Sequence, residues 1–109
     1  MATQKTRVKT RPWDPAKTIR DHEEAAVYLD VALEEAFQDG YFAAVRDVIW
    51  DIVRYKGSAK VAHDLGMDVE ELKKMFSADS TPDLSLVLKV VKALGLQLHA
   101  TVADAKSDG

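Results

Sequence analysis

The segment from Ser58 to Phe76 holds the side chains best suited, by type and spacing, to recognise another macromolecule. Its second half carries Val69, Glu70, Lys73 and Lys74 close together along a predicted helix. A valine can contact the thymine methyl group, and a carboxylate can accept a hydrogen bond from the cytosine amino group. Lysines and hydroxyl groups suit phosphate oxygens. We therefore take as candidate DNA-contacting residues Ser58, Lys60, Val69, Glu70, Lys73 and Lys74. The alternative is that these are ordinary solvated side chains on a structural scaffold.

A second charged set lies earlier in the chain. Residues 21–39 hold seven carboxylates and no lysine or arginine. Such a surface suits a basic protein partner, because complementary charge raises the rate and the specificity of association. The candidate partner-binding residues are Glu23, Glu24, Glu34 and Glu35. The alternative is an acidic face that only keeps the protein in solution.

Neither an enzyme nor a metal protein is indicated. His22, His63 and His99 are far apart in sequence, and none has a second ligand at metal spacing. The chain has no glycine-rich phosphate loop or nucleophile motif. It also has no cysteine, which excludes disulfides and thiolate metal sites. The sequence predicts no catalytic residue and no cofactor.

Apolar residues at helical spacing predict the elements that position these candidates. Five helices are expected, at about 21–38, 41–55, 58–65, 68–76 and 81–94. The second is the most apolar and should form the centre of the core. The core faces expected in the first and last helices are Ala25, Leu29, Ala32, Leu33, Ala36 and Phe37, and Leu84, Val87, Leu88, Val91 and Leu94.

Capping residues bound these helices. Asp21 with Glu24, and Asp68 with Glu71, have the capping-box spacing. Ser58 is expected to cap the third helix, and Thr81 followed by Pro82 to begin the fifth. The expected helix ends are at Gly40, Gly57, Gly66 and Gly95.

The segment 58–76 also has the features that a helix-turn-helix requires. Two short helices that meet at a steep angle need a small residue at their contact, here Ala62, and a left-handed residue at the turn, here Gly66. The apolar positions expected to anchor both helices to the core are Val61, Leu65, Met67, Leu72 and Met75. Apolar spacing alone would fit any helical hairpin. The combination of a small contact residue, a turn glycine and apolar anchors is the more specific signal.

The two ends of the chain differ from the helical body. Residues 1–20 hold six basic side chains against Asp14 alone, which predicts a basic extended arm tied down by Trp13. Arg7, Lys9 and Arg11 could reach a DNA groove, or the arm could simply be solubilising. Residues 96–102 alternate apolar and polar, which predicts a short strand. That strand would either lie on the helices as an extended tail or pair with another edge, such as that of a second subunit. The last residues should be frayed.

Composition places the chain among small globular proteins. The 109 residues are 47% hydrophobic and 30% charged, with a net charge of -3. This length suits one domain, and no apolar run is long enough for a bilayer. The N-terminus lacks the apolar stretch of a secretory signal. We expect a cytoplasmic, non-membrane protein made of an arm (1–20), a helical domain (21–95) and a tail (96–109).

Four stretches resemble the HigA-like antidote proteins of toxin-antitoxin modules, which have a lambda-repressor-like (XRE-type) helix-turn-helix domain. They are Asp14–Ala16, Ala26–Glu35, Val61 and Ala62 with Leu65 and Gly66, and Leu88–Leu96. The resemblance covers residues 13–98. It implies an all-α, five-helix domain in a homodimer. It also implies an antitoxin that neutralises a small basic toxin and binds its own promoter to autoregulate transcription.

The chain departs from that family at the end of the motif that should meet bases. There it reads Asp68-Val69-Glu70-Glu71, where polar or basic residues would be expected. Carboxylates repel phosphate, and phosphate contacts supply much of the affinity for DNA. The alternative function is therefore a protein-interaction module that neutralises a toxin while its helix-turn-helix binds DNA weakly or not at all.

Overall fold

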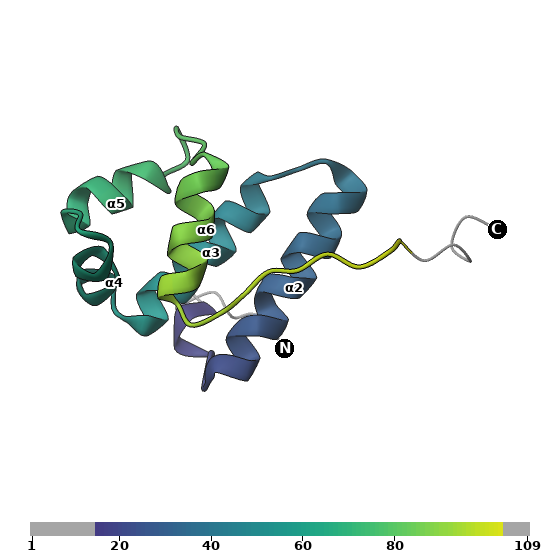
Figure 1. Cartoon of the computed structure of the whole chain (residues 1–109), viewed down its shortest axis with the longest axis horizontal. Coiled ribbons are helices and arrows are strands. Elements are labelled where there is room, and N and C mark those ends of the chain that lie inside the picture. Colours follow the sequence, from purple (N-terminus) through teal and green to yellow (C-terminus); the bar gives the residue numbers. More distant parts are fainter. Residues whose placement is uncertain (1–14, 104–109) are drawn as a thin grey trace, which may run out of the picture.

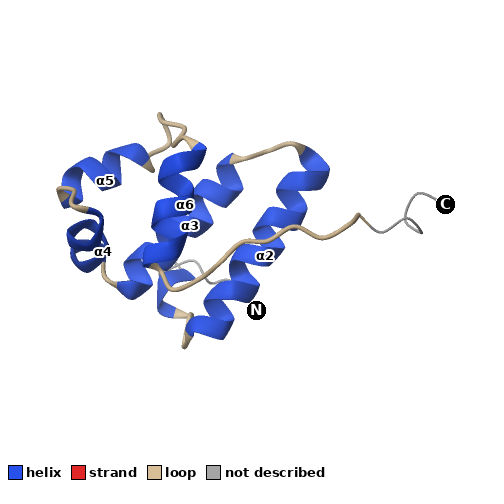
Figure 2. Ribbon diagram, viewed as in Figure 1, coloured by secondary structure: helices blue, strands red, loops and turns tan. Residues whose placement is uncertain are grey.

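The computed structural model describes residues 15–103 and shows an all-helical protein (Figure 1). A short 3-10 helix, η1 (Pro15–Lys17), precedes five α-helices. These are α2 (His22–Asp39), α3 (Ala43–Lys56), α4 (Ser58–Leu65), α5 (Val69–Met75) and α6 (Leu84–Ala93). No strand occurs between residues 15 and 103 (Figure 2). The all-α prediction is confirmed for this part of the chain.

Helix α3 lies at the centre of the core, as predicted, although α6 and not α3 is the most apolar helix. It contacts η1, α2 and α4, and α4 in turn contacts α5 and α6. The α3 side chains of Val45, Ile49, Ile52 and Val53 are each no more than 2% exposed. Burial of this size stabilises a fold by about 1.5–3 kcal/mol for each large apolar side chain. Helix α3 therefore supports α4, which in turn contacts α5 and α6.

Polar and aromatic contacts fix α2 and α5 on α3. The Tyr28 hydroxyl donates to Asp51 Oδ2 at 2.9 Å, and Arg54 Nη2 donates to Asp51 Oδ1 at 2.7 Å. The rings of Trp50 and Phe76 are stacked, with their centroids 6.2 Å apart. The Tyr28–Asp51 and Trp50–Phe76 contacts join α3 to segments distant in sequence, and Arg54 holds the Asp51 carboxylate from within α3.

The expected start of α2 is confirmed at Asp21, whose Oδ1 accepts from the Glu24 amide at 2.9 Å. In a capping box, the Glu24 side chain would accept in return from the backbone amide of the cap residue, Asp21. Here it binds the preceding residue instead. Glu24 Oε1 accepts from the backbone amide of Arg20 at 2.9 Å, and its other oxygen binds the Arg20 guanidinium. At the other end, Gly40 has φ 72° and its amide donates to the Ala36 carbonyl at 2.7 Å.

Three capping predictions need correction. Ser58 is the first residue of α4, with Gly57 at the cap position and no side-chain cap bond. Asp68 precedes α5, but its side chain caps no amide. The cap of α6 is Asp83 rather than Thr81, and Asp83 Oδ1 accepts from the Leu86 amide at 2.8 Å. Pro82 is buried just before this cap, so α6 begins two residues later than the Thr-Pro pair predicts.

The helical spacing also predicted burial for three residues that are exposed. Phe37 is 84% exposed, Leu84 69% and Leu88 47%. Phe37 lies near the end of α2, and the core face of α6 is instead Val87, Val90, Val91 and Leu94. Periodicity could not assign the core face of α6, because this helix is apolar on more than one side.

The two end segments agree only in part with the predictions. Residues 15–20 are not an extended arm, because η1 contacts α3 and both Ala16 and Ile19 are buried. Residues 96–103 form no strand, because the alternation lacks a second strand to pair with among the described residues. The segment runs beside α2 (Figure 1), which agrees with the first predicted arrangement, a tail lying on the helices. Trp13, Arg7, Lys9, Arg11 and residues 104–109 lie outside the described residues. No helix between residues 15 and 103 is long and apolar enough to cross a membrane.

Candidate functional site

The turn between α4 and α5 has the geometry that the sequence predicted. Gly66 has φ 69°, a left-handed conformation that favours glycine. Its amide donates to the His63 carbonyl at 3.0 Å, and the Met67 amide donates to the Ala62 carbonyl at 2.9 Å. These bonds end α4 and turn the chain directly into α5. We call residues 58–75 the α4–α5 unit.

Buried side chains anchor both helices of the α4–α5 unit. Val61 and Leu72 are fully buried, and Ala62 is 2% exposed. Leu65 and Met67 are partly buried against the same core. Met75 is 38% exposed and is not an anchor. Phe76 takes that role because its ring stacks on Trp50 and is 4% exposed.

The outer side of α5 carries three of the six predicted DNA-contacting residues. Glu70, Lys73 and Lys74 are exposed on this one helix. Val69 is partly buried and packs against the core, so only part of its side chain is exposed. Its position at the start of α5 directs an apolar side chain toward the body of the protein.

The two candidates on α4 are placed differently from each other. Ser58 is half-buried at the start of the helix. Lys60 is exposed, and its Nζ lies 3.7 Å from Asp64 Oδ2 one turn later. The positive charge of Lys60 is therefore partly balanced on the protein itself, and the lysines of α5 are the more available cations of the unit.

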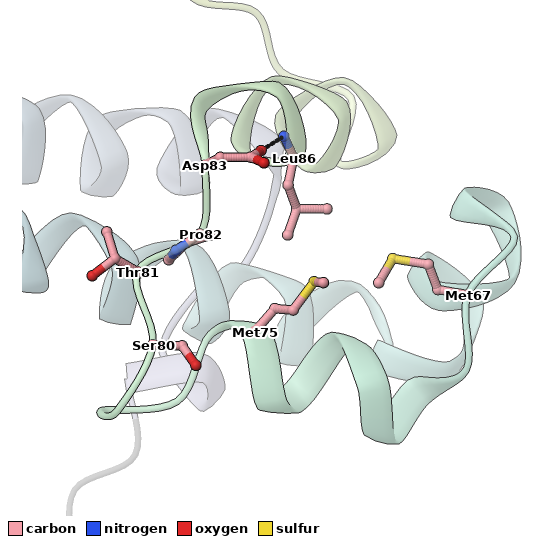
Figure 3. Close-up of a pocket in the computed structure, with 7 residues that line it drawn as sticks. All are labelled: Met67, Met75, Ser80, Thr81, Pro82, Asp83 and Leu86. Atoms are coloured by element: carbon pink, nitrogen blue, oxygen red, sulfur yellow. Dashed lines mark hydrogen bonds between the residues drawn. The ribbon is translucent and has the colours of Figure 1, made fainter.

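A hollow between α5 and α6 was not predicted from the sequence. Figure 3 shows Met67, Met75 and Leu86 pointing toward one another there, with the chain from Ser80 to Asp83 along one side. Its volume is about 340 Å³. Their spacing places both methionines in the core, but spacing does not reveal that Met75 lines an open hollow.

The predicted partner-binding carboxylates on α2 fall into two groups. Glu23, Glu34 and Glu35 are exposed. Glu24 is held by Arg20, and this hydrogen bond keeps the pKa of its carboxyl below the usual range. Glu24 is thus part of the start of the helix, which leaves the other three carboxylates to meet a partner.

The histidines do not assemble a metal site. His22 Nε2 lies 3.0 Å from Lys56 Nζ, and its ring meets Tyr55 edge-on. Among residues 15–103, no group of three or more His, Asp or Glu side chains is placed to hold a metal ion. His22 belongs to the packing between the start of α2 and the end of α3.

Comparison with known proteins assigns the chain to a family. A family model described as "Probable addiction module antidote protein" matches residues 9–102. The chain is also 31% identical, over 89 residues, to an uncharacterized protein of Haemophilus influenzae strain Rd. That similarity covers 82% of this chain and 88% of the relative. No solved structure matches. The chain belongs to the family of probable addiction module antidote proteins.

Proposed function

We propose that this protein is the antitoxin of a type II toxin-antitoxin module, of the HigA-like, XRE type, and that it represses its own promoter. Membership of an antidote family implies a cognate toxin as partner. The observation that carries the DNA-binding part is the α4–α5 unit, in which Gly66 joins two short helices anchored by Val61, Ala62 and Leu72. In a helix-turn-helix the second helix enters the major groove.

In this proposal α5 is the helix that reads DNA. Lys73 and Lys74 contact phosphates or base edges, and the Glu70 carboxylate accepts from a cytosine amino group. Ser58 and Lys60, on α4, lie toward the backbone of the duplex. Val69 supports the start of α5 by packing inward rather than by contacting a thymine. A homodimer would place two such helices on successive turns of the duplex.

Titration of the purified protein against its own upstream DNA tests this proposal. The expected result is tighter binding to this DNA than to a scrambled duplex of equal length, with affinity that falls as salt rises. Measurements at two salt concentrations give the slope of log K against log salt. Absence of both the sequence preference and the salt slope would overturn DNA binding and leave the toxin-neutralising role.

A second candidate function is neutralisation of the toxin without DNA binding. It is favoured by the acidic start of α5, where Asp68, Glu70 and Glu71 are all exposed. The ion pair between Lys60 and Asp64 lowers the available positive charge further. The DNA titration separates the two candidates, because only the first predicts a preference for the upstream sequence.

A further inference from the structure

The outward side of α2 combines exposed apolar and acidic side chains. Helical spacing places six exposed residues along this side. They are Glu23, Val27, Asp30, Val31, Glu34 and Glu35, and we call them the α2 outer face. Val27 is 63% exposed and Val31, one turn later, is 47% exposed. The charge pattern of the sequence predicts a partner for the acidic residues, and the structure adds the two valines between them.

Val27 borders two adjoining hollows, and Val31 borders one of them. One, of about 460 Å³, is lined by Ile19 and Tyr28 together with both valines. The other, of about 620 Å³, lies on the opposite flank of Val27, between α2 and the segment beginning at Gly95. A ridge with a groove on each side is the surface shape that a second helix can pack against. Single exposed valines are ordinary, but a valine that borders two hollows offers a partner apolar contact on both flanks.

Charge identifies the class of partner that this surface fits. The carboxylates of Glu23, Asp30, Glu34 and Glu35 are exposed, and none forms an ion pair with any residue between 15 and 103. A second copy that packed its own α2 outer face here would bring like charges together, which costs binding energy. A nucleic acid would meet four carboxylates with its phosphates. Only a partner with apolar side chains flanked by lysine or arginine gains from both components.

We infer that the α2 outer face is the docking surface for the toxin, and that it takes a basic amphipathic segment whose apolar side chains pack around Val27 and Val31. The inference rests on the proposed antitoxin function. In this arrangement the valines mainly slow dissociation of the complex, and the carboxylates mainly raise the association rate. The α4–α5 unit remains free, so that the toxin and DNA can be bound at separate surfaces.

The test uses the purified full chain and the purified protein encoded by the gene beside it. Calorimetry and stopped-flow mixing give Kd and the association rate. The apolar variant is V27S/V31S, and its matched control is L84S/L88S, which removes two equally exposed side chains from α6. The charge variant is E34Q/E35Q, and its control is E71Q/D79N, which removes two exposed carboxylates outside α2. Thermal melting of each variant verifies that it is folded.

The inference expects V27S/V31S to weaken binding at least tenfold, mainly through faster dissociation. It expects E34Q/E35Q to slow association several-fold at low salt, with both controls within twofold of the unchanged protein. Hydrogen exchange should show protection of residues 22–36 in the complex. Binding of the neighbouring protein that is insensitive to V27S/V31S would overturn the docking surface alone. Failure of the unchanged chain to bind that protein would overturn the antitoxin function, and this inference with it.

Discussion

The Met67 amide donates to the Ala62 carbonyl at 2.9 Å, across a left-handed Gly66. This bond sets where α4 ends and how α5 leaves it, so the turn fixes the orientation of the helix proposed to read DNA. Lack of space does not explain the glycine, because a Cβ at residue 66 would meet nothing within 4 Å. The requirement lies in the backbone conformation.

Gly66→Ala should therefore lower the free energy of unfolding by about 1 kcal/mol, since alanine adopts a positive φ poorly. Gly66→Asn should cost less, because asparagine tolerates this conformation. Urea unfolding of the three proteins measures both effects. Equal stability of the alanine variant and the unchanged protein would contradict the assigned turn.

The two aspartates that precede α5 and α6 should respond differently to removal. Asp83 Oδ1 accepts from the Leu86 amide, whereas Asp68 caps no amide. We expect Asp83→Ala to cost about 1 kcal/mol of stability, the usual value for a lost cap. Asp68→Ala loses only the interaction of its charge with the helix dipole and serves as the matched control. Thermal or urea unfolding compares them, and an equal loss from both would disprove the assigned cap.

Tyr28 gives the protein a pH dependence at alkaline pH. Burial, followed by the hydrogen bond to Asp51, raises its pKa to about 12 from an ordinary value of 10. The folded state thus favours the neutral phenol, and this stabilisation is complete below pH 10 and is lost as the pH rises toward 12. Ultraviolet titration should show one tyrosine ionising near pH 12 in the folded protein, absent in Tyr28→Phe. The assignment would be refuted if Tyr28→Phe instead removed a tyrosine whose pKa is near the ordinary value of 10.

The positions of the helices could be predicted from the sequence because their ends carry local signals. The Asp21 cap and the left-handed glycines at 40 and 66 act within a few residues of themselves, so single positions identify them. One of the three corrected caps, that of α6, is explained by tertiary burial. Pro82 is drawn into the protein interior, and the start of α6 moves to Asp83.

The functional surfaces could be predicted only in part. Charge and exposure of Lys73 and Glu70 follow from the helical pattern, but the inward packing of Val69 depends on the angle between α4 and α5. The exposure of Val27 and Val31 follows from which side of α2 meets α3. The strand predicted at 96–102 lacks a pairing partner within the described chain, a condition that alternation alone cannot reveal.

The central claim is that α5 binds the promoter, and its most direct test is the salt dependence of a lysine variant. K73Q/K74Q removes two exposed cations from α5, and K89Q/K92Q removes two from α6 as a matched control. Titration against the upstream DNA at several salt concentrations should show weaker binding by K73Q/K74Q and a slope of log K against log salt reduced by about 1.8. K89Q/K92Q should bind as the unchanged protein does. An unaltered slope and affinity for K73Q/K74Q would contradict the account.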